Sequence, residues 1–301
     1  METPAAETPA VPESAQAALE AAGLGRALPG GESLPGGMIS LTRRVRTDRG
    51  HSVVLKQCVN HSIPHDLYAR EAEGLNALRI PGAPRVPGVY AFAEDFIVME
   101  DLGAPISAVS DTAWEAFGHA LAVQHRCTAP RFGFEHDNYL GIVPQRNAWT
   151  DDAVGQWIEE RVLHYLPLPI VQKTLTAEQR RGVERFCAFA RRHIPTQPPA
   201  LLHGDLWYAN ALITQAGEPA TLDPAVYFGL PEVEISLTRQ WGHFEPRFYD
   251  AYAEHGILLD GWQDRLEFYY IAQLVGIIAH VGDHWPDVIE SLDALIQKYC
   301  G

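Results

Sequence analysis

Basic side chains are scarce in this sequence of 301 residues: 23 Lys and Arg stand against 38 Asp and Glu, and the formal net charge is −15. Nucleic-acid binding depends on a basic surface, so the composition argues against a nucleic-acid partner. Lysine occurs at three positions only, which are Lys56, Lys173 and Lys298. Any role that requires a lysine therefore has few candidates.

Cysteines and targeting signals are equally sparse. The four cysteines show no Cys-x-x-Cys spacing, which suits a reducing compartment and calls for neither disulfides nor structural zinc. Residues 1–11 are acidic and Pro-rich and lack the apolar region of a signal peptide, so they predict a disordered tail. The longest nearly apolar run, Tyr269 to Val281, is shorter than the ~20 residues that cross a bilayer. We therefore expect a cytoplasmic protein without a membrane partner.

The stretch richest in reactive groups is His203-Gly-Asp-Leu-Trp-Tyr-Ala-Asn210, with Asp223 a short distance beyond it. Phosphoryl transfer needs one carboxylate that orients and deprotonates a hydroxyl, and further oxygen ligands that hold Mg²⁺ on the nucleotide phosphates. Asp205 fits the first role, and Asn210 and Asp223 fit the second. We expect His203 to brace the loop rather than to react. The spacing predicts the active site of a kinase.

A hairpin is expected to bring the two metal ligands together. Residues 210–214 and 219–223 have the pattern of two short strands around a turn that contains Gly217. A turn centred on Ala216 and Gly217 would pair Asn210 with Asp223, and directly opposed residues lie ~5 Å apart. Both side chains would then share one cation. The alternative is an ordinary surface hairpin with polar ends.

Lys56 is the natural candidate for the lysine that grips the nucleotide phosphates, because it ends the β-branched apolar run 51–56. The residues that follow predict a helix from about Asp66 to Leu78. On that helix Glu71 shares one face with three leucines. An acidic residue on an apolar face needs a cationic partner, and Lys56 fits. The alternative is a tolerated glutamate at the helix edge.

Two further segments are candidates for nucleotide binding. Gly36 and Gly37 could form a loop whose backbone amides bind phosphate oxygens, although a Pro-Gly-Gly run is often an ordinary turn. Residues 95–102 predict a buried strand that leads into a connector. In a two-lobed kinase this connector pairs with the purine. That makes Met99 a candidate pocket wall, and Glu100 to Leu102 the candidate pairing segment.

The second half of the chain predicts helices. Thr176 and Gln179 have the pattern of a capping box at the start of a helix that runs to about His193. Residues 112–125 predict another amphipathic helix. Together with the earlier strands, this predicts an α+β, bilobal, protein-kinase-like fold. We expect a small β-rich N-terminal lobe over residues 12–102 and a larger, mostly helical lobe over residues 103–301.

These segments resemble one known family. The chain is similar to the fructosamine kinases (ketosamine 3-kinases), which belong to the aminoglycoside phosphotransferase-like branch of the protein-kinase fold. The resemblance runs from about Leu34 to the mid-260s. It rests on Leu34-Pro-Gly-Gly37, Phe132-Gly-Phe134, Asp137-Asn-Tyr-Leu-Gly141, His203-Gly-Asp-Leu-Trp207 and Asp223-Pro-Ala-Val-Tyr-Phe-Gly229. The resemblance implies phosphorylation of a hydroxyl on a sugar attached to an amine, with ATP as donor. The sequence does not distinguish ATP from GTP.

The chain also departs from the family pattern. Tyr208-Ala209 stand where the family has Ser-Gly, Glu234 stands where the family has a supporting aspartate, and residues 269–280 replace a helix rich in His and Asn. These changes leave the phosphate chemistry intact and concern the acceptor. Candidate acceptor-binding residues are Asp205, Trp207 and Glu234. Trp207 would either stack on the sugar or serve as a buried anchor of the loop.

The acceptor is expected to be a small molecule, because no long activation segment fits between Asp223 and the helix that begins near Glu232. An acidic surface mildly favours an amine-bearing acceptor, and solubility explains it equally well. The main alternative is an O-phosphotransferase that inactivates an aminoglycoside or nucleoside antibiotic. A nucleotide-binding pseudokinase is a third possibility. The sequence does not predict the oligomeric state.

Overall fold

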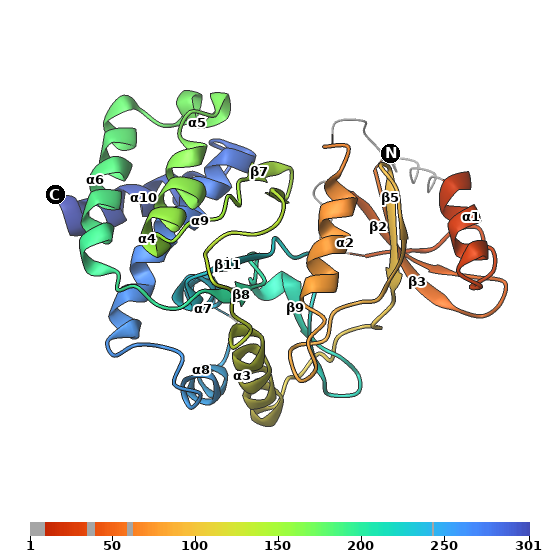
Figure 1. The fold of residues 1–301 in the computed structure, drawn as a ribbon. Coiled ribbons are helices and arrows are strands. Elements are labelled where there is room, and N and C mark those ends of the chain that lie inside the picture. The colour runs from red at the N-terminus through yellow and green to blue at the C-terminus, as the bar shows by residue number, and fades with distance from the viewer. Residues whose placement is uncertain (1–9, 35–39, 59–62, 243) are drawn as a thin grey trace, which may run out of the picture.

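The computed structural model describes residues 10–34, 40–58, 63–242 and 244–301. They form two lobes joined by a connector that follows residue 100 (Figure 1). A five-stranded sheet and two helices make the smaller lobe, and helices dominate the larger one. The expected α+β bilobal architecture is confirmed. We propose residues 12–102 and 103–301 as the lobes; of the expected N-terminal tail, residues 1–9 lie outside the described residues.

The sheet of the smaller lobe is antiparallel, in the order β1-β2-β3-β5-β4. β3 lies at its centre and is paired on both edges, which fixes the backbone on either side of Lys56. The strands are β1 (Glu32–Ser33), β2 (Leu41–Arg46), β3 (Ser52–Gln57), β4 (Val89–Phe92) and β5 (Phe96–Glu100).

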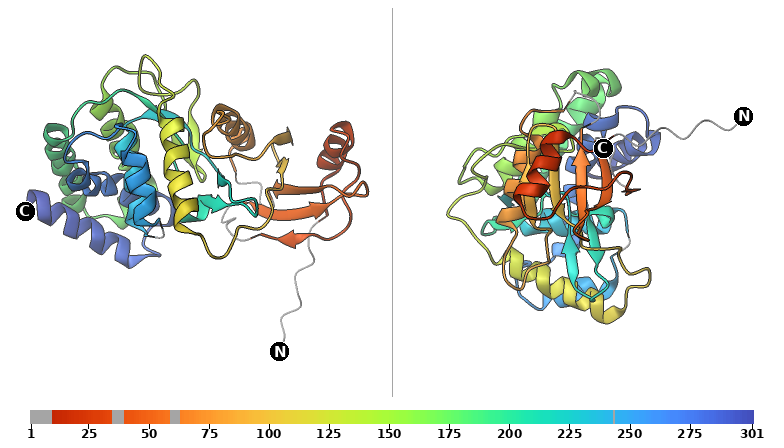
Figure 2. Two further views of the ribbon diagram at one scale, coloured as in Figure 1. Left: turned by 90° about the horizontal axis from the view of Figure 1, so that it is seen from below. Right: turned by 90° about the vertical axis from the view of Figure 1, so that its right-hand side faces the viewer.

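Two helices cover opposite faces of this sheet. α1 (Glu13–Ala21) lies at the end of the molecule far from the larger lobe (Figure 2), and α2 (Leu67–Ala77) lies on the face toward it (Figure 1). Side chains alternate along a strand. Val53 and Leu55 therefore pack with α1, whereas Lys56 projects toward α2.

Helices of the larger lobe surround its apolar core. The largest cluster joins α4, α6, α9 and α10 and includes Trp157, Phe186 and Tyr269. At the start of α6 both hydrogen bonds of the predicted capping box are present. Within the described part of the chain, no helix has the length and apolar character needed to span a membrane. The helices are α3 (Asp111–His125), α4 (Ala153–Arg161), α5 (Pro169–Thr174), α6 (Ala177–His193), α7 (Pro231–Gln240), α8 (Pro246–Ala253), α9 (Trp262–Val281) and α10 (Pro286–Cys300).

Three short antiparallel strand pairs carry the loops that face the smaller lobe. They pair β6 with β7, β8 with β11, and β9 with β10. A 3₁₀ turn, Tyr208–Asn210, precedes β9. The strands are β6 (Asn138–Leu140), β7 (Val143–Gln145), β8 (Ala200–Leu202), β9 (Ala211–Ile213), β10 (Pro219–Thr221) and β11 (Tyr227–Gly229).

The register of the β9-β10 hairpin differs by one residue from the expected one. Gly217 has a φ of 80°, and the loop closes over residues 215–217 because Thr214 bonds to both Gly217 and Glu218. This is a three-residue hairpin loop with glycine in the left-handed region. The Leu222 N–H consequently donates to the Asn210 carbonyl at 2.9 Å. The predicted pairing of Asn210 with Asp223 is therefore wrong, and Asp223 lies just beyond the ladder.

The β9-β10 hairpin also contacts the smaller lobe. The Arg85 N–H donates to the Pro219 carbonyl, and the Arg85 carbonyl accepts from the Thr221 N–H, both at 2.8 Å. The Arg85 guanidinium pairs with Glu218 at 3.0 Å and with Glu100 at 2.5 Å. The lobes are thus connected at this point as well as through the covalent connector.

Gly118 allows α3 and α8 to pack closely. A Cβ at this position would lie 2.3 Å from the Phe248 carbonyl oxygen and 3.0 Å from the Ala251 Cβ. We predict that Gly118→Ala lowers the free energy of unfolding by about 1–3 kcal/mol, because the added methyl overpacks the interface. Helix propensity alone would give a gain of about 1 kcal/mol.

Urea unfolding measures directly whether the variant is less stable or more stable than wild type. Ala116→Gly, at an exposed position of the same helix, serves as the control and should cost about 1 kcal/mol through propensity. A Gly118→Ala protein more stable than wild type would contradict the close packing of α3 and α8.

Candidate active site

The loop that carries Asp205 leaves β8 through a glycine that no other residue can replace. Gly204 has a φ of 85°, and a Cβ there would lie 2.0 Å from the Ala225 carbonyl oxygen. The left-handed conformation and the close approach both require glycine. The loop is thereby held against the segment that leads into β11, and its turn is fixed.

Glu234, on α7, supports this loop by accepting hydrogen bonds from its backbone. Its Oε2 accepts the His203 N–H at 2.9 Å, and its Oε1 accepts the Gly204 N–H at 2.7 Å. His125 on α3 lies 2.9 Å from the same Oε2. Burial alone would raise the pKa of Glu234, but the hydrogen bonds from His125 and from the His203 N–H hold this pKa below its usual value.

This position differs from the acceptor-binding role expected for Glu234. Its side chain is 1% exposed and both carboxylate oxygens are already bound to the loop and to His125. A glutamate reaches the loop backbone from α7 where the family pattern has the shorter aspartate. Glu234 therefore supports the backbone of the loop at His203 and Gly204.

His203 occupies the bracing position that the sequence predicted. Its Nε2 donates to the Leu222 carbonyl at 2.8 Å, and its Nδ1 accepts the Asp205 N–H at 3.3 Å. The ring is fully buried. Burial lowers its pKa, so the neutral ring links the loop to the segment before Asp223.

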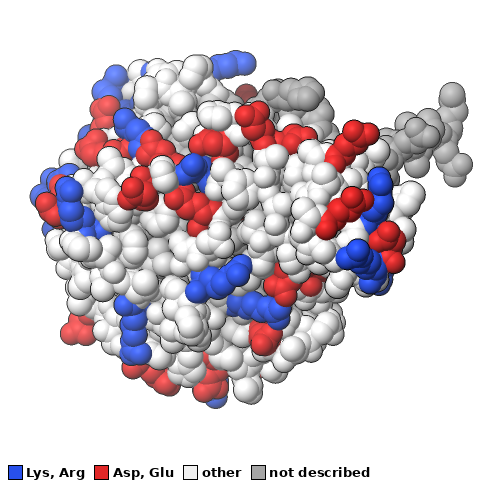
Figure 3. All heavy atoms as spheres, turned by 45° about the vertical axis from the view of Figure 1, so that its right-hand side comes forward, with Lys and Arg blue, Asp and Glu red and all other residues white. Residues whose placement is uncertain are grey.

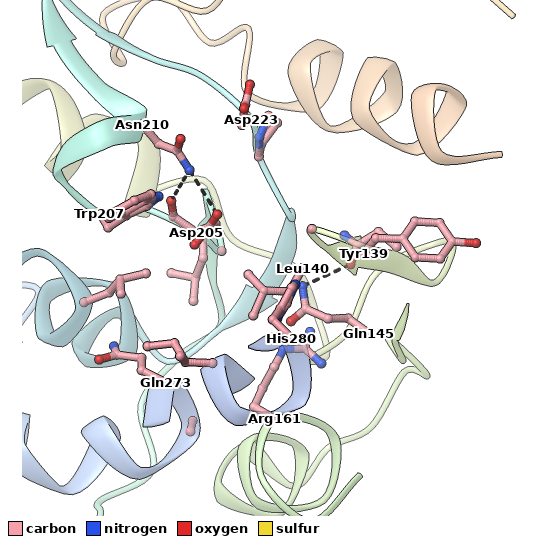
Figure 4. Close-up of a pocket in the computed structure, with 18 of the residues that line it drawn as sticks. Tyr139, Leu140, Gln145, Arg161, Asp205, Trp207, Asn210, Asp223, Gln273 and His280 are labelled. Carbon is pink, nitrogen blue, oxygen red and sulfur yellow. Dashed lines mark hydrogen bonds between the residues drawn. The ribbon is translucent and has the colours of Figure 1, made fainter. Parts of the chain in front are cut away.

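Asp205 and Asn210 are in direct contact. The Asn210 Nδ2 donates to the Asp205 backbone carbonyl at 2.9 Å and to its Oδ2 at 3.0 Å, as the dashed lines in Figure 4 show. Burial and the nearby charge of Asp223 raise the pKa of Asp205 well above its usual value, although the Asn210 hydrogen bond opposes this shift. A carboxylate with a raised pKa is a better proton acceptor.

Lys56, Glu71 and Asp223 form an ion cluster across the two lobes, in which Lys56 and Glu71 are largely buried and Asp223 is partly exposed. The Lys56 Nζ donates to Glu71 Oε1 at 2.6 Å and also to Asp223 Oδ1. Burial disfavours the charged lysine, but the two carboxylates raise the pKa of Lys56 above its usual value. Asp223 has a φ of 55° and is the one described non-glycine residue with positive φ. The predicted pairing of Lys56 with Glu71 is thus present.

These groups open into one cavity of about 700 Å³ between the lobes. Most of the residues predicted for the site line it: Lys56, Glu71, Asp205, Trp207, Asn210, Asp223 and Glu234. Figure 4 shows Asp205, Asn210 and Trp207 on one side of this space. Trp207 is partly exposed and lies edge-to-face against Tyr208, with ring centroids 4.9 Å apart.

The sequence reasoning missed part of the cavity lining. Tyr139 and Gln145 come from the β6-β7 hairpin, Arg161 from the end of α4, and Gln273 and His280 from α9 (Figure 4). The first two lie in or beside segments that carry the family resemblance. For α9 the available signal was the spacing of Gln273, Ile277 and His280, which places them on one helical face.

The remaining nucleotide candidates lie outside this cavity or outside the described residues. Gly36 and Gly37 fall in the undescribed range 35–39. Met99 is 3% exposed and packs in the core between the sheet and α2. The Glu100 side chain bonds to Arg85 and to the Gly88 N–H. Leu102 follows β5, at the start of the connector.

Together, the fold and the site define a phosphotransferase of the protein-kinase-like class: a lysine–glutamate pair on the small lobe faces Asp205, Asn210 and Asp223 on the large lobe. The chain belongs to the fructosamine kinase family, whose family model matches residues 12–298. It is therefore a kinase whose acceptor group is a hydroxyl of a sugar.

Known relatives cover most of the chain. An Enterococcus faecium protein described as a ketoamine kinase is 30% identical over 270 residues, which are 88% of this chain and 93% of the relative. The chloroplastic protein-ribulosamine 3-kinase of Arabidopsis thaliana is 31% identical over 251 residues, 79% of this chain and 74% of the relative. A solved structure from Thermobifida fusca, assigned as a fructosamine-3-kinase, is 26% identical, has a TM-score of 0.84, and covers 95% of this chain and 100% of its own.

The support of the catalytic loop by Glu234 can be tested through stability. We predict that Glu234→Gln lowers the free energy of unfolding by about 2 kcal/mol at neutral pH, because it replaces charge-assisted hydrogen bonds in a buried site. The folded-state pKa of Glu234 is lowered. The contribution is therefore complete above the unfolded pKa of ~4.3 and is lost as the pH falls through the folded value.

The measurement is urea unfolding of wild type and variant from pH 8 down to about pH 2.5, a range that extends below the unfolded pKa of ~4.3. The difference between the two proteins should shrink toward the acid end of this range. Glu94→Gln, at an exposed position, is the matched control and should change little. A difference that grows as the pH falls would contradict the geometry described for Glu234.

Proposed function

We propose that this protein phosphorylates a ketosamine, which is a sugar joined to an amine, with ATP or GTP as donor and Mg²⁺ as cofactor. The observation that carries the proposal is the convergence of Asp205, Asn210, Asp223 and Lys56 on one cavity, in a chain that belongs to the fructosamine kinase family. The names of the ketoamine kinase and ribulosamine kinase relatives support the choice of acceptor.

Asp205 receives the proton in the proposed reaction. The acceptor hydroxyl oxygen forms a bond to the γ-phosphorus while the bond from that phosphorus to the leaving diphosphate oxygen breaks. The hydroxyl proton passes to the Asp205 carboxylate, whose raised pKa suits this role. Asn210 holds the carboxylate in place through the bond to Oδ2.

Asn210 and Asp223 suit a magnesium ion. Their amide and carboxylate oxygens are the hard donors that Mg²⁺ prefers, and Mg²⁺ usually takes one or two such protein ligands together with substrate phosphates. Asp223 is 43% exposed on its side chain and therefore accessible from the cavity. When bound, the ion would neutralise charge on the phosphate oxygens.

Lys56 would bind the α- and β-phosphates. Its ammonium has three donor hydrogens, of which Glu71 and Asp223 take two. The third is available to a phosphate oxygen, and Glu71 keeps the side chain oriented. We propose that the backbone from Glu100 to Leu102 pairs with the base beside Met99.

The acceptor side supports a small, amine-bearing sugar. Trp207 is partly exposed beside Asp205, where an indole face could stack on a sugar. The chain carries a net charge of −15, and acidic and basic side chains are interspersed on the face shown in Figure 3.

The comparisons support the antibiotic alternative less. The four free cysteines are consistent with a proposed cytoplasmic location.

Loss of the Asp205 carboxylate should separate catalysis from binding. We predict that Asp205→Asn lowers turnover of fructosyl-lysine or ribulosyl-lysine at least about 100-fold, because the hydroxyl proton loses its acceptor. Nucleotide affinity should stay close to that of wild type. Release of nucleoside diphosphate measures turnover, and calorimetry measures nucleotide binding.

Asp264→Asn, at an exposed position on α9, is the control and should keep full activity. Full activity of Asp205→Asn would remove Asp205 from the catalytic role. Turnover by the wild type on an antibiotic, and on no ketosamine, would reassign the acceptor and leave the catalytic centre in place.

The metal role of Asn210 predicts a change in magnesium dependence. EDTA should abolish activity, and Asn210→Ala should raise the Mg²⁺ concentration for half-maximal activity at least about tenfold, because one oxygen ligand is lost. Asn76→Ala, exposed on α2, is the matched control. An unchanged magnesium dependence in Asn210→Ala would exclude this asparagine as a ligand.

A further inference from the structure

One wall of the cavity is apolar and uncovered. Val233 and Leu237 lie four residues apart on α7, which places them on one helical face, and Trp241 immediately follows the last residue of this helix. The adjacent helix α9, which carries Ile277 and Val281, and the turn after it, which carries Trp285, complete this surface. We call it the apolar wall, and it consists of Val233, Leu237, Trp241, Ile277, Val281 and Trp285, all of which line the cavity.

These side chains remain partly open to solvent, and the two tryptophans are well exposed. Trp241 is 39% exposed and Trp285 is 49% exposed. Tyr208, which is 44% exposed, lines the same cavity. Isolated exposed apolar side chains are common, but a group of them that converges on one concave site marks a binding surface.

Most polar groups of the cavity come from segments other than this wall, although Gln273 and His280 share α9 with Ile277 and Val281. Asp205, Asn210 and Asp223 come from the catalytic loop and its hairpin, and Tyr139 and Gln145 come from the β6-β7 hairpin. Figure 4 shows both sets around the space, with Gln273 and His280 bordering it from α9. A sugar needs hydrogen-bond partners for its hydroxyls, which the polar groups offer and the apolar wall does not.

The occupant of the wall must therefore be a second part of the same acceptor. The wall and Asp205 share one cavity of about 700 Å³, which is within the ~300–1,000 Å³ range of sites that hold a drug-sized molecule. In a ketosamine, the part that is not sugar is the group carried by the amine. Burial of apolar surface against this wall would contribute to binding in proportion to its area.

We infer that the preferred acceptor is a ketosamine whose amine carries an apolar group of aromatic size, and that the apolar wall selects it. This inference rests on the proposed function and deepens it. The sugar hydroxyl lies at Asp205 while the apolar group covers the wall. Trp285 and Leu237 are then specificity-determining residues of this chain.

Two ketosamines that differ only in the amine group test the inference. We expect the kcat/KM for fructosyl-benzylamine to exceed that for fructosyl-ethanolamine at least about tenfold. Trp285→Ala and Leu237→Ala should each reduce this ratio. Phe92→Ala is the matched control, because Phe92 is also 49% exposed but lies on β4, outside the cavity. Thermal unfolding of each variant verifies that it is folded.

Calorimetric binding of both compounds distinguishes this inference from the proposed function. Equal kcat/KM for the two compounds, or a ratio that survives in both wall variants, overturns the inference and leaves the proposed function standing. Absence of turnover with both compounds and also with fructosyl-lysine and ribulosyl-lysine overturns the proposed function. In that case tighter binding of fructosyl-benzylamine that Trp285→Ala abolishes supports the wall, and equal or absent binding overturns it.

Discussion

The ion cluster of Lys56 with Glu71 and Asp223 is the interaction on which the arrangement of the two lobes depends. Lys56 and Glu71 are largely buried, and removal of a charge from water costs several kcal/mol per ion, so the Lys56 ammonium needs its carboxylate partners to remain in place. Lys56 and Glu71 belong to the small lobe, and Asp223 belongs to the large lobe. Lys56 therefore ties the two lobes together at the point where we propose that the nucleotide phosphates bind.

A nucleotide brings its own negative charge into this cluster. Phosphate oxygens can take over the lysine contact that Asp223 now makes, and a divalent ion can take over the carboxylate. Lys56 would then keep a negatively charged partner, while Asp223 is exchanged for a phosphate oxygen. Glu71, whose contact with Lys56 is within one lobe, is the fixed member of the set.

Local sequence patterns predicted the parts of the site that depend on short-range geometry. Strand alternation and helical periodicity placed Lys56 and Glu71 face to face, and the structure joins them at 2.6 Å. The register of the β9-β10 hairpin was missed because Gly217, in its left-handed conformation, closes a three-residue loop. The composition of the turn does not distinguish this loop from the two-residue loop that was predicted. The error was one residue, which matters because it moves Asp223 out of the ladder.

Other features could not be read from local pattern because they depend on packing between distant segments. Glu234 lies 31 residues beyond His203, yet its carboxylate accepts the backbone N–H of that residue. The position of an acidic residue in a helix does not predict which distant backbone groups its side chain contacts. Likewise, which face of α9 meets the cavity depends on how α7 and the β6-β7 hairpin pack against it.

The Arg85 connection has a mechanical consequence. Arg85 binds the β9-β10 hairpin through its backbone on both sides, and its guanidinium links Glu218 to Glu100. If these bonds hold while the cleft opens, the lobes can move only by rotating about Arg85, which then acts as a hinge. The hairpin that turns with it leads directly to Asn210 and Asp223. Opening of the cleft and displacement of Asn210 and Asp223 would then be a single motion.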